Sequence, residues 1–144
     1  MRYTTKMNNF MIRFIHLCDA ASVDSLRKLS ILGIFDRIYL TEVPKKFPKF
    51  TVVLDMDIRK YEKKQYIFEI TVVGPKDDLP IKPVEIKFNL PDKESLSDRP
   101  HMNMILELRD VEFTSYGHHA VSVRVDGQVI GKKEFTVEKP PKKL

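Results

Sequence analysis

The chain has 144 residues, the length of one ordinary domain. Hydrophobic residues make up 42% and charged residues 31% of it, a balance typical of soluble globular proteins that argues against a collagen, a coiled coil, a disordered chain and a multi-span membrane protein. Lys and Arg number 25 against 20 Asp and Glu, so the net charge is +5 at pH 7 and nucleic acid has to be considered as a partner.

The single cysteine, Cys18, limits disulfide and metal chemistry. One thiol excludes an internal disulfide and a structural zinc site built on two or four cysteines. An unpaired cysteine fits a reducing compartment, so we expect a cytoplasmic protein.

The first apolar run, residues 10–18, has the features of a signal segment and of a strand. Arg13 and His16 interrupt the run, and Leu17 stands where signal cleavage needs a small residue. We therefore expect a strand over residues 9–18. Since no stretch reaches the ~18 apolar residues of a transmembrane helix, we expect no membrane contact.

Residues 20–28 are the best helix candidate, but the segment is short and has no capping residue at its end. We interpret it as a loop or a single helical turn between two strands. The apolar segment that follows predicts a second strand over residues 28–40.

Beyond residue 40, apolar and polar residues alternate along most of the chain. Successive side chains of a strand point to opposite faces, so alternation indicates antiparallel strands with one buried and one solvated face. Prolines fall between the alternating runs, where they do not interrupt a hydrogen-bonded ladder. The pattern predicts strands at 49–59, 64–74, 83–90, 101–113, 117–125 and 129–137.

Two registers are open if residues 49–59 and 64–74 form a hairpin. One places Asp55 opposite Glu69, a like-charge pair that destabilises a sheet unless a cation lies between them. The other places Asp55 opposite Ile67, and we prefer it.

The last hairpin needs a correction of register. A two-residue Asp126-Gly127 turn would put Phe135 and Val137 on the face away from Val121. We therefore predict either a three-residue loop or a β-bulge near Gly131.

About eight strands in one domain predict an all-β fold, an antiparallel two-sheet immunoglobulin-like sandwich over residues 1–138. Residues 139–144 are rich in proline and lysine, and we expect a flexible tail there.

Three short motifs are distinctive: Leu17-Cys18-Asp19, Leu32-Gly33-Ile34-Phe35-Asp36, and the closing hairpin with Gly117 and Val123-Arg124-Val125-Asp126-Gly127. In these motifs the chain resembles a family of short, uncharacterised all-β bacterial proteins of unknown function. The resemblance covers most of the chain and implies a sandwich fold. It implies no activity, ligand or catalytic residue.

Metal ligands are sparse in the sequence. His16 and Cys18 share one strand face, but a site would need two further ligands. Asp55 and Asp57 share the solvated face of their strand, and no calcium-binding loop of the Asp-x-Asp-x-Asp-Gly type exists. A predicted loop gathers three more acids: Asp92, Glu94 and Asp98. We expect these acids to be solvated, and we assign no metal and no cofactor.

Catalytic motifs are also missing. The sequence has no Gly-x-Ser-x-Gly elbow, no P-loop and no Gly-x-Gly-x-x-Gly turn. We assign no catalytic residue and expect that the protein is not an enzyme.

Nucleic-acid binding is the sharper alternative. Aromatic residues at 47, 50 and 61 are interleaved with basic residues and could stack bases, while the basic residues neutralise phosphates. The two basic groups flank one strand of about nine residues, which separates them by ~30 Å at ~3.3 Å per residue. The candidate contacts are Lys45, Lys46, Lys49, Arg59, Lys60, Lys63 and Lys64.

The function that we expect is a non-catalytic binding or scaffold module, with a protein partner or a second copy held at end loops or at a sheet edge. The alternative is the basic nucleic-acid-binding module that uses the lysine clusters at the strand ends.

Overall fold

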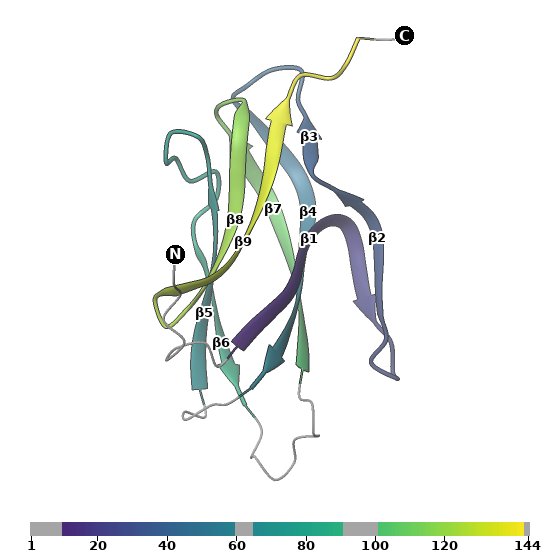
Figure 1. Ribbon diagram of the computed structural model, residues 1–144. Helices are drawn as coiled ribbons and strands as arrows, with labels where there is room; N and C mark the ends of the chain where they lie inside the picture. The colour runs from purple at the N-terminus through teal and green to yellow at the C-terminus, as the bar shows by residue number, and fades with distance from the viewer. Residues whose placement is uncertain (1–9, 60–64, 91–100, 143–144) are drawn as a thin grey trace.

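The structure is a computed structural model that describes residues 10–59, 65–90 and 101–142. In these ranges the chain forms two sheets, and Figure 1 shows them packed face to face. One sheet has four strands in the order β2-β1-β4-β7, and the other has five in the order β3-β9-β8-β5-β6. The bounds are β1 Phe10–Val23, β2 Leu29–Phe35, β3 Arg37–Tyr39, β4 Lys45–Ile58, β5 Gln65–Val73, β6 Val84–Asn89, β7 His101–Phe113, β8 Gly117–Val125 and β9 Gln128–Glu138. The predicted all-β sandwich is confirmed.

The core lies between the two sheets and uses the apolar positions that alternation picks out. Phe50 and Leu54 of β4, Phe68 of β5 and Val121 of β8 are at most 1% exposed. Burying one such side chain is worth about 1.5–3 kcal/mol, so these positions carry the stability of the fold. No described segment forms a helix long and apolar enough to cross a membrane.

The predicted strand at 28–40 is two strands, so the prediction of a single strand was wrong. β2 pairs with β1 in the four-stranded sheet, whereas β3 pairs in parallel with β9 in the other sheet. Phe35 and Ile38 both pack on the core although they are three residues apart. A single regular strand would place them on opposite faces, and the change of sheet at Asp36 removes that conflict.

The interpretation of residues 20–28 as a loop or a helical turn was wrong for its first part. β1 continues past residue 18 to Val23, because Ala20 to Val23 pair with Leu32 to Leu29 of β2. The actual turn occupies residues 24–28.

Residues 49–59 and 64–74 do not form a hairpin, so neither of the two registers considered for it occurs. β4 pairs with β1 and β7, whereas β5 pairs with β6 and β8 in the other sheet. Asp55 lies opposite Asn103, and Glu69 lies opposite Glu85 and Arg124. Both strands bury their even-numbered residues in either arrangement, so alternation does not distinguish a hairpin from two facing sheets.

The correction expected in the last hairpin is confirmed as a β-bulge. Val125 pairs with Gln128 across the Asp126-Gly127 turn, while Val123 pairs with Gly131. The register therefore shifts by one residue between Val123 and Arg124, and Ile130 of β9 lies opposite no residue of β8. The bulge returns Phe135 to the core, where it is 2% exposed.

Candidate protein-binding arm

A two-stranded ribbon extends from one edge of the four-stranded sheet. The pairing of β1 with β4 ends at Cys18 opposite Thr51, but the pairing of β1 with β2 continues to Val23 opposite Leu29. Residues 19–33, which we call the arm, therefore have no third strand beside them among the described residues. Figure 1 shows β1 arching away from the sandwich into this hairpin. Isolated two-stranded ribbons are only marginally stable in water, so the arm needs support.

The arm carries the most exposed apolar side chains of the described residues. Leu26 is 77% exposed, Leu32 is 70% exposed, and Ile34, directly beside the arm, is 56% exposed. Every other large hydrophobic side chain that the structure describes is more buried than these three. Leu32 and Ile34 are two residues apart on one face of β2, and adjoining exposed apolar side chains mark interaction surfaces in soluble proteins.

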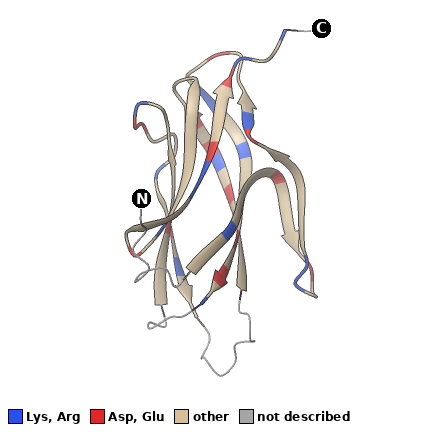
Figure 2. Ribbon diagram, viewed as in Figure 1, with Lys and Arg blue, Asp and Glu red and all other residues tan. Residues whose placement is uncertain are grey.

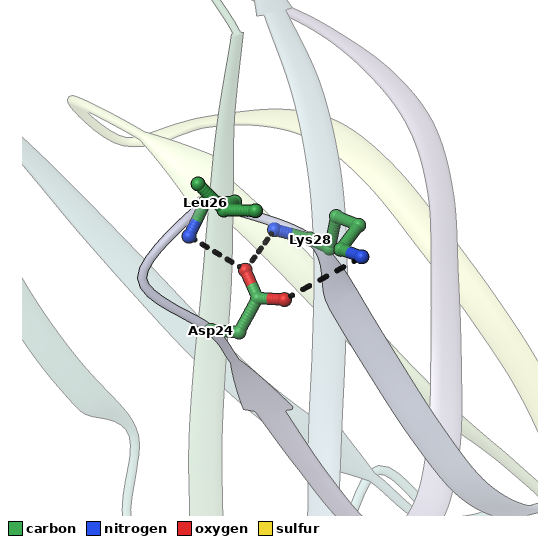
Figure 3. A network of polar contacts seen from close by, with 3 residues as sticks. All are labelled: Asp24, Leu26 and Lys28. Atoms are coloured by element: carbon green, nitrogen blue, oxygen red, sulfur yellow. Dashed lines mark hydrogen bonds and ion pairs between the residues drawn. The ribbon is translucent and has the colours of Figure 1, made fainter.

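The tip of the arm is held by one carboxylate, as Figure 3 shows. Oδ1 of Asp24 accepts hydrogen bonds from the backbone N–H of Leu26 at 2.8 Å and of Lys28 at 2.9 Å. The backbone N–H of Asp24 donates to the carbonyl of Lys28 at 3.0 Å. These bonds order the turn and hold Leu26 at its outermost point in a defined position.

The root of the arm requires a glycine. Gly33 has a φ of +70°, a conformation that glycine adopts without strain. The side chain of Asp19 lies where a Cβ of residue 33 would be. The arm separates from the sandwich at this point: Leu17 is fully buried, whereas Asp19 is exposed.

The free edge of β2 has no charged residue and no proline. Its seven residues are Leu-Ser-Ile-Leu-Gly-Ile-Phe, and Figure 2 shows the strand without acidic or basic positions. The edge strands β6 and β7 contain charged residues, including Glu85, Lys87, Glu107 and Arg109. Charged residues on an edge strand prevent another chain from pairing with it, and β2 lacks this protection.

The predicted nucleic-acid contacts lie at both ends of β4 where the structure describes them. Lys45 and Lys46 begin the strand, and Nζ of Lys49 lies 4.0 Å from Oε2 of Glu107. Arg59 follows the other end of the strand and donates to Sδ of Met11 at 3.4 Å. The remaining candidates lie outside the described residues: Lys60, Lys63 and Lys64.

The aromatic residues between these lysines do not form a stacking surface. Phe50 is fully buried, and Phe47 packs against it with the ring centroids 6.0 Å apart. Both rings belong to the core or its margin, because they are on the inward side of β4. Tyr61 lies outside the described residues. Nucleic-acid binding stays a prediction without this support.

The candidate ligands His16 and Cys18 pair with Val53 and Thr51 of β4, so they share one face of β1. Cys18 is buried, and this burial, followed by the nearby charge of Asp19, raises the pKa of the thiol. No group of three or more potential ligands occurs within the described ranges. The acids at 92, 94 and 98 lie outside those ranges.

Asp55 was expected on a solvated strand face, and this was wrong. Asp55 is 5% exposed, because β4 lies between β1 and β7 in the sheet. Arg13, the extra residue of a β1 bulge, lies 3.4 Å from Oδ2 of Asp55. The carboxylate is thus held in a structural ion pair.

A groove of about 460 Å³ on the outer face of the five-stranded sheet brings together residues that the sequence did not single out. Its lining includes His118, Lys132 and Glu134, with Asp77 from the connection after β5. Lys132 and two histidines, His118 and His119, lie beside the two acidic side chains, so the groove has no dominant charge. The groove therefore indicates no ligand class.

The arm was not predicted as a site from the sequence. The signal was present in the run Leu29–Phe35, which is apolar at nearly every position rather than at every second one. Such a run is typical of a strand covered on both faces, yet this strand lies at an exposed edge.

Comparisons with known proteins give a family and distant structural neighbours. A search of curated proteins finds no match. Among solved structures, the chain is 15% identical to the alkylpurine DNA glycosylase AlkC of Pseudomonas fluorescens bound to DNA containing an abasic site analog, with a TM-score of 0.48 and coverage of 90% of this chain and 30% of that chain. It is 13% identical to a β-glucosidase of Listeria innocua in complex with isofagomine, with a TM-score of 0.44 and coverage of 87% and 16%.

This chain therefore spans less than a third of either enzyme. A neighbour of similar length is an immunoglobulin-like protein (PA1606) of Pseudomonas aeruginosa, 16% identical, with a TM-score of 0.41 and coverage of 92% of this chain and 98% of that one. Residues 13–138 match the model of a family of unknown function, DUF6941, and the chain belongs to that family.

Proposed function

We propose that this protein is a non-catalytic binding module whose arm holds an extended, uncharged apolar segment of a protein partner against the free edge of β2. The observation that carries the proposal is the coincidence of two features on β2 and the turn before it. β2 contains no charged residue. The side chains of Leu26, Leu32 and Ile34, on this strand or in the turn before it, are the most exposed large apolar groups of the described residues.

The apolar side chains alone would not hold a partner. At their present exposure, burying Leu26, Leu32 and Ile34 would contribute about 3–6 kcal/mol, from about 1.5–3 kcal/mol for each fully buried side chain. Association costs about 4–15 kcal/mol in lost translational and rotational freedom. Backbone hydrogen bonds along β2 must supply the difference, and they form only if the partner adds a strand to this edge.

The experiment places a photoreactive benzophenone amino acid at position 26, in the protein expressed in its native host. We expect irradiation to give covalent adducts that mass spectrometry maps to an extended apolar segment. The control places the same group at position 79, which is 51% exposed but lies in the connection between β5 and β6.

A second variant tests the role of the edge. Leu32→Lys introduces a charge beside the β2 edge without removing a buried side chain, since Leu32 is 70% exposed. We expect this change to abolish the adducts from position 26. Adducts that persist in Leu32→Lys, or that form equally from position 79, would contradict the proposal.

A further inference from the structure

We infer that the strand bound by β2 is the β2 strand of a second copy of this chain, paired antiparallel about a two-fold axis at Leu32. This inference rests on the proposed function of the β2 edge and names its partner. It predicts a dimer in which the two four-stranded sheets join into one continuous sheet.

The symmetry limits the registers that are available. A two-fold axis perpendicular to the sheet keeps each face of both strands on the same side, so one residue of β2 must lie opposite its own counterpart. Only an axis at the middle residue, Leu32, pairs all seven residues of the strand. Leu29 then lies opposite Phe35 of the second copy.

The side chains are complementary in this register. Leu32 lies opposite Leu32 of the second copy, where Cβ atoms are about 4.5–5.5 Å apart in a sheet, so two exposed apolar side chains bury each other. Ile31 lies opposite Gly33 of the second copy, a large residue against one without a side chain. Ser30 lies opposite Ile34 on the same face as Leu32.

The charges that flank β2 favour the same register. One residue beyond the strand at each end, Lys28 lies opposite Asp36 of the second copy, and symmetry repeats the pair. An axis at Ile31 would place Lys28 opposite Ile34, and an axis at Gly33 would place Asp36 opposite Ser30. Both side chains are exposed, and Nζ of Lys28 lies 4.0 Å from Oδ2 of Asp24 in its own turn, so these pairs select the register more than they add affinity.

Pairing of β2 with itself also closes the assembly. If β2 were to bind another edge, such as β7, each copy would leave one edge free and the chains would grow into open filaments. β7 opposes this arrangement with the charged residues Glu107, Arg109, Asp110 and Glu112. In the β2 pair, each copy covers the free β2 edge of the other. The charged β7 strands then form the two outer edges of the joined sheet.

The first experiment measures the dimer by sedimentation equilibrium of the purified full chain. We expect a concentration-dependent dimer whose dissociation constant rises at least tenfold in Leu32→Lys, which brings two ammonium groups together at the axis. The matched control, Leu79→Lys, adds the same charge to a residue that is also exposed and leaves the dimer unchanged. Thermal melting of both variants verifies that they are folded.

Charge reversal tests the register. Lys28→Asp and Asp36→Lys, each alone, place like charges opposite one another, and we expect each to raise the dissociation constant about threefold. The double variant restores opposite charges and is expected to return the constant toward that of the unmodified chain. Since the double variant carries both substitutions, its rescue excludes damage to the turn at Asp24 as the cause.

Disulfide trapping gives a readout that does not depend on affinity. In Leu32→Cys, the two introduced thiols face each other across the axis, and copper phenanthroline is expected to oxidise them to a covalent dimer. Cys18 is buried and does not compete. Leu79→Cys serves as the control and is expected to stay monomeric.

The outcomes separate this inference from the proposed function. A monomer at all concentrations, together with position-26 adducts to a different protein, would overturn the second copy as partner while the binding function stands. A dimer that is insensitive to Leu32→Lys would place self-association elsewhere and also overturn the inference. Absence of both dimer and adducts would overturn the two together.

Discussion

β4 and β2 each contain an apolar run, and the two runs lie in opposite environments. β4 contains the apolar run Val52-Val53-Leu54, and all three residues are at most 1% exposed. β2 contains the apolar run Ile31-Leu32-Gly33-Ile34, but Leu32 and Ile34 are largely exposed. The difference is the number of neighbours: β4 lies between β1 and β7, whereas within the described residues β2 has only β1 beside it.

The comparison teaches that neighbouring strands, rather than the opposing sheet alone, decide whether an apolar strand is covered. The outward residues Thr51 and Val53 are buried because side chains of β1 and β7 flank them. β2 has the apolar composition of a strand with a neighbour on each side, but within the described residues it has a neighbouring strand on one side alone. This unmatched composition is the reason to expect another chain there.

The largest effect is expected from a change in the covered strand. Phe50→Ala removes a fully buried ring that contacts Phe35, Phe47 and Phe135, and should lower the free energy of unfolding by about 3–5 kcal/mol. Urea denaturation measures the loss. A loss below 1 kcal/mol would contradict the description of β4 as the covered strand.

A smaller effect is expected at the root of the arm. Gly33→Ala forces a side chain into positive φ and against Asp19, and should cost about 1–2 kcal/mol. The same urea measurement detects it, and hydrogen exchange should show the loss in residues 19–33. Gly127→Ala has a positive φ but no atom within 4 Å of its Cβ, so the comparison isolates the contact with Asp19.

In the exposed strand, truncation should leave the isolated chain nearly unchanged. Leu32→Ala is expected to alter the free energy of unfolding by less than about 0.5 kcal/mol when measured at concentrations where the monomer prevails. At high concentration the same substitution should weaken the dimer. A large loss of monomer stability would show that Leu32 is covered within the chain.

The smallest effect concerns Cys18, which marks the place where the arm leaves β4. Burial raises the pKa of its thiol, so the folded state favours the protonated form. The contribution of this thiol to the free energy of unfolding is fully present at pH values below the ordinary thiol pKa. It is lost as the pH rises through the higher pKa of the folded state. A urea series between pH 7 and pH 10, with Cys18→Ala as reference, measures this loss.

The same thiol reports on the attachment of the arm. Labelling of Cys18 by a thiol reagent should be slow in the native chain and fast in urea, because the side chain lies between Thr51 and Ile34. Equal rates in the two conditions would indicate that the junction opens freely.

Much of the fold followed from local patterns. Alternation identified the core-facing residues of β4, β5 and β8, since successive side chains of a strand point to opposite faces. The parity of Phe135 against Val121 predicted either a three-residue loop or a bulge near Gly131, and the structure has the bulge. The arm was missed, because residues 20–28 contain too little apolar periodicity to show that they belong to an extended ribbon.

The sequence by itself determined which residues of a strand share a face, since turn chemistry and period-2 alternation act over a few residues. Only the tertiary structure decided which strands are neighbours: β4 and β5 bury the same parity in a hairpin or in facing sheets, and local pattern assigns both arrangements the same core. It also decided that β2 is an open edge, because exposure depends on strands that are distant along the chain.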